Sequence, residues 1–279
     1  MARAPIAVFF ALSAESGSFE DLLQKKERVH AADFQLTSGT LEGIDFLSVL
    51  TGAGSPNARR TAETVCRSHQ PRLVVSAGFA GSLNSSLQKH ELFFPNEFLT
   101  EEAASAEDER LTAFTKFQAE HLPKELRTES HFGGRLLTVR EVVTQPEAKR
   151  TLGSRFQARA ADMESYAIAD VCRELNLPFF SVRVISDGAE EPLPQDVQKL
   201  VQQKTTASRL GAALQMIVTR PASVRDLFGL YETSVESASR LAAVLKSLAA
   251  SGLADFLSEN FFPPQEPGRL LEAVTPPTE

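Results

Sequence analysis

The stretch ADMESYAIADVCRELNLPFFSVRVISDG, at residues 161–188, combines a helical pattern with a mainly apolar run. Apolar residues at helical spacing predict a helix over Met163–Leu175, and Asp162 stands where a helix cap is expected. Asn176-Leu177-Pro178 then interrupts the pattern, and the next run predicts a strand over Phe179–Ser186. A helix followed directly by a buried strand is typical of an α/β protein.

The same alternation continues on both sides of this stretch. The apolar runs predict strands over Ile6–Leu12, Asp45–Leu50, Leu73–Ala77, Glu91–Phe98 and Arg135–Val143. The helical patterns predict helices over Phe19–His30, Ala58–His69, Glu107–His121, Pro146–Leu152 and Pro194–Val218. Runs without polar residues, such as Leu73-Val74-Val75, suit a sheet that helices cover on both faces.

The character of the sequence changes after Val218. Arg220-Pro221 breaks the chain, and Val224–Leu248 has apolar residues at helical spacing. We expect this helix to pack against the main domain or against a partner subunit. The last residues are rich in Pro and Glu, which favours disorder. The predicted organisation is a catalytic domain over 1–219, a helical extension over 220–260 and a disordered tail over 261–279.

Composition excludes several classes of protein. The chain has 29 Lys and Arg against 36 Asp and Glu, a net charge of −7, whereas a general nucleic-acid binder presents a basic surface. No apolar run reaches the about 20 residues of a membrane span. We interpret residues 5–12 as a buried strand rather than a signal peptide, because acidic Glu15 and a helical pattern follow at once. A cytoplasmic protein is the simplest interpretation.

The cysteines and histidines suggest neither a disulfide nor a metal site. Cys66 and Cys172 lie in predicted helices, and we expect both to be buried thiols. The five histidines are scattered, without the spacing of a zinc site. No motif for an organic cofactor is present, so none is expected.

Two glycine-rich stretches are candidates for ligand binding. Thr51-Gly52-Ala53-Gly54-Ser55-Pro56-Asn57 stands between a strand and a helix, and Ser76-Ala77-Gly78-Phe79-Ala80-Gly81-Ser82-Leu83 follows an apolar strand. Glycine allows close approach to a ligand, and ligands of open α/β sheets gather at the carboxyl ends of strands. The spacing fits neither a dinucleotide-binding nor a Walker motif. Tight turns selected for packing are the alternative explanation.

Glu164 and Asp187 each have a structural alternative when taken alone. Glu164 could complement the dipole of the helix that begins beside it, and Asp187 could be a turn residue before Gly188. Asp187 follows Glu164 by 23 positions. Residue type does not separate the structural roles from the functional ones.

Taken together, these stretches resemble the nucleoside phosphorylase/nucleosidase superfamily. The resemblance runs in order from about Ile6 to Val218, and the Glu164–Asp187 separation is that of its methylthioadenosine/adenosylhomocysteine nucleosidase branch. A hopanoid-associated phosphorylase-like branch is at least as similar over residues 162–194. The resemblance implies a three-layer α/β/α fold with a central mixed, partly barrel-like sheet. It also implies a homo-oligomer, most simply a homodimer, in which partner residues complete the site.

The resemblance assigns roles to the matched residues. Glu164 would bind the ribose hydroxyls, Met163 would pack on the sugar, and Asp187, helped by Ser186, would protonate the purine at N7. Glu15 would position the attacking water. Cleavage of a C–N glycosidic bond creates positive charge on the sugar and negative charge on the base, so an acid at the base and a carboxylate near the sugar both assist it. The remaining substrate-binding candidates are Val142, Val143, Phe79, Ala80, Gly81, Gly52 and Gly54.

Departures from the family pattern decide between the possible reactions. Phosphorylases of the superfamily hold phosphate with arginines, and no motif assigns that role to Arg59, Arg60 or Arg140. Phe79 stands where the nucleosidases often carry Ser. The favoured reaction is hydrolysis of an adenosine-like thioether or a related purine nucleoside. The alternatives are a phosphorylase with inorganic phosphate as co-substrate, and a non-catalytic protein that binds a nucleoside.

Overall fold

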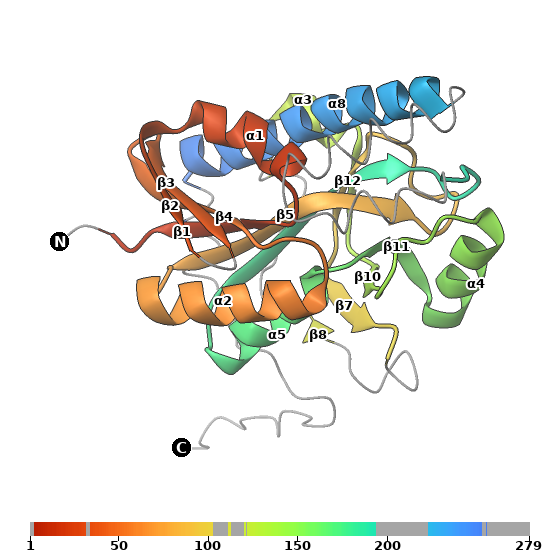
Figure 1. Cartoon of the computed structure of the whole chain (residues 1–279), viewed down its shortest axis with the longest axis horizontal. Coiled ribbons are helices and arrows are strands. Elements are labelled where there is room, and N and C mark those ends of the chain that lie inside the picture. Colours follow the sequence, from red (N-terminus) through yellow and green to blue (C-terminus); the bar gives the residue numbers. More distant parts are fainter. Residues whose placement is uncertain are drawn as a thin grey trace, which may run out of the picture.

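The computed structural model describes residues 3–31, 34–102, 111–112, 120, 122–193, 223–252 and 255. One mixed sheet runs through the molecule, with α1 and α8 on one face and α2 and α5 on the other (Figure 1). The described strands are β1 Ile6–Phe10, β2 Gln24–His30, β3 Gln35–Leu41, β4 Ile44–Leu50, β5 Leu73–Ser82, β6 Leu92–Phe94, β7 Glu97–Thr100, β8 Leu111–Thr112, β9 Ser130–Phe132, β10 Arg135–Thr138, β11 Ala158–Asp162 and β12 Phe179–Asp187. The described helices are α1 Ser13–Leu22, α2 Ser55–His69, α3 Lys124–Arg127, α4 Pro146–Phe156, α5 Ser165–Glu174 and α8 Ser223–Ala250.

Strand β5 is the centre of the sheet. It pairs in parallel with β1 and with β12, and its last residues, Gly81 and Ser82, pair antiparallel with β11. Strand β1 also pairs in parallel with β4. The carboxyl ends of these parallel strands therefore lie at one edge of the sheet, the position where α/β folds bind ligands.

Apolar side chains on both faces of the sheet hold the layers together. In β1, Val8 and Phe10 join the core cluster that includes α1 and α8, whereas Ala7 and Phe9 join the cluster that includes α2 and α5. Alternate residues of a strand point to opposite faces, so a strand covered on both sides must be apolar throughout. The structure confirms the predicted α/β fold with its helix-covered mixed sheet.

The N-terminal region departs most from the prediction. The helix predicted over Phe19–His30 ends at Leu22, and the chain continues as strand β2, which pairs with β3. Neither strand was predicted. Every residue of β2 is exposed, because β2 is the edge of the sheet. An exposed edge strand has polar residues throughout, so its sequence lacks the apolar alternation that identifies a strand.

Other predicted elements also change their bounds. The strand predicted to end at Ala77 continues to Ser82, the strand predicted over Glu91–Phe98 divides into β6 and β7, and the strand predicted from Arg135 ends at Thr138. Within the predicted helix Glu107–His121, residues 111–112 form strand β8 instead. The rest of that helix apart from residue 120, the predicted helix Pro194–Val218 and the whole predicted tail over 261–279 lie outside the described residues.

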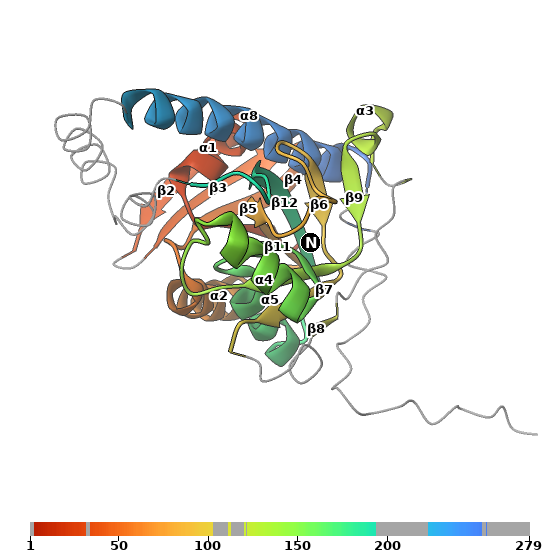
Figure 2. The same ribbon diagram turned by 90° about the vertical axis from the view of Figure 1, so that its right-hand side faces the viewer.

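The helix predicted over Val224–Leu248 is α8. It lies along α1 and over β12, as the view turned by 90° also shows (Figure 2). Its side chains Leu241, Leu245 and Leu248 are fully buried and share the core cluster of Phe19 on α1. The extension is therefore part of the layer that covers the sheet.

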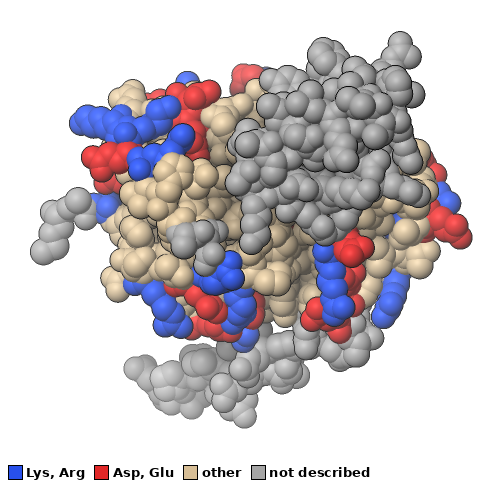
Figure 3. All heavy atoms as spheres, viewed as in Figure 1, with Lys and Arg blue, Asp and Glu red and all other residues tan. Residues whose placement is uncertain are grey.

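Charged side chains of both signs are interspersed on the described part of the face in Figure 3. Arg28 of the edge strand β2, for example, pairs with Glu20 of α1 at 2.8 Å. Among the described helices, none is both long enough and apolar enough to span a membrane.

Candidate functional site

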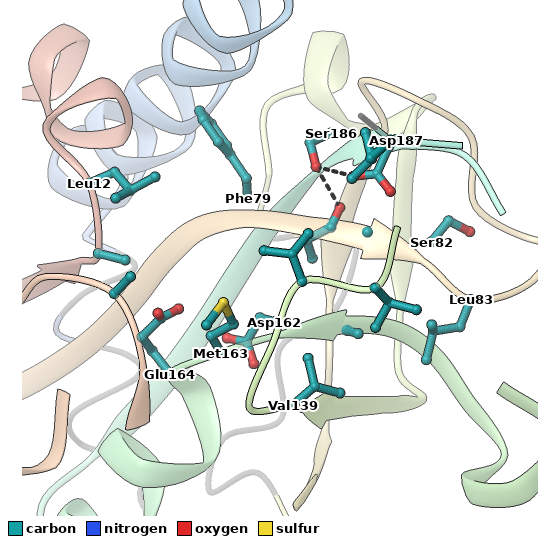
Figure 4. Close-up of a pocket in the computed structure, with 18 of the residues that line it drawn as sticks. Leu12, Phe79, Ser82, Leu83, Val139, Asp162, Met163, Glu164, Ser186 and Asp187 are labelled. Atoms are coloured by element: carbon teal, nitrogen blue, oxygen red, sulfur yellow. Dashed lines mark hydrogen bonds between the residues drawn. The ribbon is translucent and has the colours of Figure 1, made fainter. Parts of the chain in front are cut away.

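A cleft of about 250 Å³ opens at the carboxyl ends of β1, β5 and β12 (Figure 4). The loop after β10 and the connection from β11 to α5 complete its walls. Its lining is mainly apolar, with four carboxylic acids: Glu15, Asp162, Glu164 and Asp187. Glu164 and Met163 lie on one side of the cleft, and Ser186 and Asp187 lie on the other (Figure 4).

The structure brings most of the predicted site residues to this cleft. The residues that line it are Glu15, Phe79, Ala80, Gly81, Val142, Val143, Met163, Glu164, Ser186 and Asp187. Gly52 and Gly54 do not line it, although Ala53 between them does. Both glycines have positive φ, 78° and 93°, a conformation that favours glycine. Gly54 also contacts the site, because its N–H donates to Glu164 Oε1 at 2.6 Å.

Backbone donors hold the Glu15 carboxylate in place. Glu15 is in the first turn of α1, where Oε2 accepts from the N–H groups of Ala11 and Leu12, and Oε1 accepts from the N–H of Phe79 at 2.8 Å. The carboxylate thus caps α1 and joins it to β5. Burial raises the pKa of Glu15, while these hydrogen bonds and the charge of Arg183 oppose the rise. The Glu15 carboxylate is therefore positioned by backbone hydrogen bonds and not by an ion pair.

Glu164 stands directly before α5, at the end of the loop that follows β11. Burial, together with the nearby charge of Asp162, raises the pKa of Glu164 to about 8, and the Gly54 hydrogen bond opposes this. At neutral pH Glu164 is therefore held largely as the neutral acid. The predicted helix cap is Asp162, whose Oδ2 accepts from the Ser165 N–H at 2.9 Å.

A buried arginine supports the floor of the site. Arg183 of β12 is 2% exposed, and its guanidinium donates to Asp162 Oδ2 at 2.9 Å and to Ser76 Oγ at 2.6 Å. It also donates to the Ser165 hydroxyl. Asp162 therefore joins β11, α5 and β12, and its charge is compensated within the core.

Asp187, at the end of β12, is held in a different way. Its Oδ2 accepts from Lys149 Nζ at 2.6 Å, and its Oδ1 accepts from the Ser186 hydroxyl at 2.6 Å. The Lys149 side chain is fully buried, and Asp187 is 4% exposed. This carboxylate has a cation as its partner, which neither Glu15 nor Glu164 has at hydrogen-bond distance among the described residues.

The glycines of strand β5 explain why SAGFAGSL is no turn. A Cβ on Gly78 would lie 2.7 Å from Glu15 Oε1, and a Cβ on Gly81 would lie 2.9 Å from Asp187 Oδ2. Both distances are too short for a carbon against an oxygen. Each glycine therefore gives one carboxylate room to lie against strand β5, which runs on through both positions to Ser82.

A second, smaller cavity of about 10 Å³ lies behind Glu15. Its polar lining comes from Glu15, Glu164, Arg183, Ser76 and Thr51. This is about the space that one water molecule needs, and the polar groups could hold it by hydrogen bonds.

The arginines considered as phosphate ligands are occupied elsewhere. Arg59 pairs with Asp170 and Glu174 of α5, and Arg140 pairs with Glu102 and is 71% exposed. Arg60 donates to Asn57. None of the three lines the cleft. The described residues also contain no cluster of His, Cys, Asp or Glu that could hold a metal.

Lys149 is the residue that the sequence analysis missed. With Gly153 and Phe156 it forms the buried face of α4, at helical spacing. A lysine among the buried positions of an amphipathic helix is the signal that could have identified it, because lysine is almost never fully buried without a partner.

The geometry defines an α/β protein with a mixed sheet. Its mainly apolar cleft contains four carboxylic acids and lies at the carboxyl ends of the parallel strands β1, β5 and β12. The sequence matches the family described as the Phosphorylase superfamily over residues 5–219, and the chain belongs to this family. The 5'-methylthioadenosine/S-adenosylhomocysteine nucleosidase of Geobacillus sp. (strain WCH70) is 25% identical over 202 residues, which cover 66% of this chain and 85% of the relative.

Solved structures share the fold. The 5'-methylthioadenosine/S-adenosylhomocysteine nucleosidase of Neisseria meningitidis, in complex with methylthio-immucillin-A, aligns with a TM-score of 0.66 and 20% identity. The alignment covers 88% of this chain and all of that one. Futalosine hydrolase of Helicobacter pylori strain 26695 aligns with a TM-score of 0.64 and 20% identity, over 86% of this chain and 97% of that one. At these identities the likeness establishes the fold.

Proposed function

We propose that this protein hydrolyses the N-glycosidic bond of a purine-type nucleoside, with adenosine-like thioethers as the first class of substrate to test. The observation that carries the proposal is the placement of carboxylic acids on both sides of one apolar cleft (Figure 4). The sugar and the base of a nucleoside require opposite electrostatic stabilisation, because the sugar gains positive charge and the base gains negative charge as the bond breaks. The curated relatives with this reaction in their names support the same class.

The proposed roles follow the two sides of the cleft. Glu164 binds the ribose hydroxyls, and Met163 packs against the sugar. Asp187, oriented by Ser186, serves the base at N7 as its general acid. Val142, Val143 and the β5 residues Phe79, Ala80 and Gly81 provide the apolar walls, while Gly52 and Gly54 shape the loop that contacts Glu164.

Water is the proposed nucleophile, for two reasons. Lys149, the one basic residue among the described residues of the lining, is already paired with Asp187, so an incoming phosphate would find no free cation there. The small polar cavity behind Glu15 has room for a water molecule. Glu15 would orient that water and accept its proton.

The deciding experiment measures base release from methylthioadenosine, adenosylhomocysteine, adenosine, inosine and guanosine, with and without inorganic phosphate. Release without phosphate, with a free sugar as the second product, is expected. Strict dependence on phosphate, with a ribose 1-phosphate product, would make the protein a phosphorylase. Binding of a nucleoside without release under either condition would favour the non-catalytic alternative.

The variant Glu15→Gln tests the role of water directly. The amide keeps an acceptor for the backbone N–H groups but cannot take a proton, so hydrolysis should fall by roughly 10²-fold or more. Circular dichroism and thermal unfolding provide the control for folding. A variant with normal hydrolysis would remove Glu15 from the mechanism.

We also propose that the protein is a homo-oligomer, most simply a dimer, as the resemblance to the family implies. Analytical ultracentrifugation at micromolar concentration tests this. Sedimentation at the mass of a single chain would contradict it.

A further inference from the structure

Lys149 occupies an unusual position for a lysine. Its side chain is fully buried between α4 and the end of β12, yet it also lines the cleft. Its ammonium group can donate three hydrogen bonds, and three acceptors are present: Asp187 Oδ2 at 2.6 Å, Gly188 O at 2.8 Å and Glu191 O at 2.8 Å. The ammonium is therefore fully satisfied without water.

The packing of α4 brings Lys149 to Asp187. A Cβ on Gly153 would lie 2.6 Å from the backbone oxygen of Leu83, so only glycine allows α4 to approach the end of β5 this closely. Phe156, seven residues after Lys149, is buried on the same side of the helix. An apolar residue at position 149 would fill this space without the cost of burying a charge. The charge at this place thus calls for a functional explanation.

The charges around the pair single out Lys149. Apart from it, the titratable residues that line the cleft are Glu15, Asp162, Glu164 and Asp187, all acids. Outside the cleft, the carboxylate of Glu191 pairs with Lys89 at 3.1 Å, and Glu190 pairs with Arg150 at 2.6 Å. Lys149 is thus the one basic side chain among the described residues that line the cleft.

We propose that Lys149 supplies, through Asp187, the proton that the leaving base receives. This inference deepens the proposed function and rests on it. A carboxylate has no proton to donate, but an ammonium group paired with it can supply one. As the C1′–N9 bond breaks, its electron pair moves to the base, Asp187 gives a proton to N7, and the proton of Lys149 passes to Asp187 Oδ2. Lys149 ends neutral and Asp187 ends as a carboxylate, while Glu15 takes the proton of the attacking water.

Two other roles for Lys149 must be distinguished from proton supply. A residue that only holds Asp187 in place would act through hydrogen bonds and charge, and an arginine provides both. Arginine cannot be deprotonated in proteins, so it cannot pass on a proton. A residue that only stabilises the fold would affect every substrate alike.

The test compares Lys149→Met and Lys149→Arg on two substrates. One is a purine nucleoside that the wild type cleaves, and the other is 4-nitrophenyl riboside, whose leaving group departs without protonation. Both variants should lower kcat for the purine nucleoside by roughly 10²-fold, within the range of general acid catalysis, and should largely retain cleavage of the nitrophenyl substrate. Lys149→Met added to Asp187→Asn should cause no further loss. Lys89→Met, which changes a lysine that contacts the same loop, is the matched control and should resemble the wild type.

Different outcomes overturn different claims. Purine cleavage restored by Lys149→Arg would make Lys149 a positioning residue only, and an equal loss on both substrates would make it a structural one. Either result overturns proton supply and leaves the proposed hydrolysis standing. A wild-type protein that releases no base from any purine nucleoside overturns the proposed function and, with it, this inference.

Discussion

The two sides of the cleft hold their carboxyl groups by different physical means. On the side of the proposed sugar site, Glu15 and Glu164 accept from backbone N–H groups, and burial raises the pKa of each. On the opposite side, Asp187 is paired with a fully buried lysine. Replacing a buried carboxyl group that has no cation beside it leaves no charge unpaired, whereas replacing one that is paired with a buried lysine leaves the ammonium without a counter-charge. Replacing the same group by an amide should therefore have opposite consequences on the two sides.

The largest effect is expected on the side of Asp187. Asp187→Asn should lower kcat for a purine nucleoside by at least about 100-fold, because an amide cannot act as an acid. Steady-state kinetics with a purine nucleoside measures this. Near-normal turnover in a folded variant would show that the base leaves without help from Asp187.

The same variant should also be less stable than the wild type. Removing the negative charge leaves Lys149 buried without a counter-charge, and breaking a buried pair in this way costs about 3–5 kcal/mol. The three acceptors of Lys149 partly remain, since the amide of the variant would still offer an oxygen, so the loss should fall at the lower end. Denaturant unfolding at pH 7 provides the measurement, and unchanged stability would mean that the pair contributes nothing to the fold.

The glycines of β5 allow the two sides to be disturbed separately. Gly78→Ala places a carbon against Glu15, and Gly81→Ala places one against Asp187. Displacing a catalytic group by about 1 Å can cost up to roughly 10²-fold in rate, so both variants should be slower. Only Gly78→Ala should also weaken α1, because Glu15 caps that helix. Gly188→Ala is the control, since its Cβ would meet nothing within 4 Å. Equal activity of all three variants would contradict the close contacts.

An effect of opposite sign on stability is expected for Glu164→Gln. The folded pKa of Glu164, about 8, is above the ordinary value of 4.5, so the folded protein binds this proton more tightly than the unfolded chain does. Wild-type stability should therefore fall as the pH rises from about 4.5 to about 8, and the glutamine variant should not share this loss. In thermal unfolding, the variant should be more stable relative to the wild type at pH 9 than it is at pH 5. A gain at pH 5 would contradict the raised pKa.

The activity of the same variant tests the role of Glu164 at the sugar. Glu164→Gln should weaken substrate binding and turnover together, since an amide offers one oxygen to the two ribose hydroxyl groups where a carboxyl group offers two. The wild type should discriminate against a 2′-deoxynucleoside, and the variant should discriminate less. A wild type that cleaves both sugars equally well would remove Glu164 from this role.

The sequence by itself determined the α/β architecture and most of the cleft. Buried parallel strands such as β1 consist of apolar residues, and this pattern can be read from the sequence without knowledge of the contacts. Glu15, Glu164 and Asp187 were identified through the resemblance to the nucleoside phosphorylase/nucleosidase superfamily, because residue type alone did not separate structural roles from functional ones. The same reasoning failed at β2, whose exposed residues carry no pattern, and at Gly78 and Gly81, which were interpreted as turn residues.

Only the tertiary structure decided what the acids contact. Lys149 is 38 residues from Asp187 in the chain, and the pair exists because Gly153 lets α4 approach β5. Glu15 is 64 residues from its donor Phe79, and Gly54 is 110 residues from Glu164. Local sequence governs the periodicity that forms helices and strands, but burial and charge pairing depend on which elements pack together. The protonation state of each acid, and thus its chemistry, is a property of the folded chain.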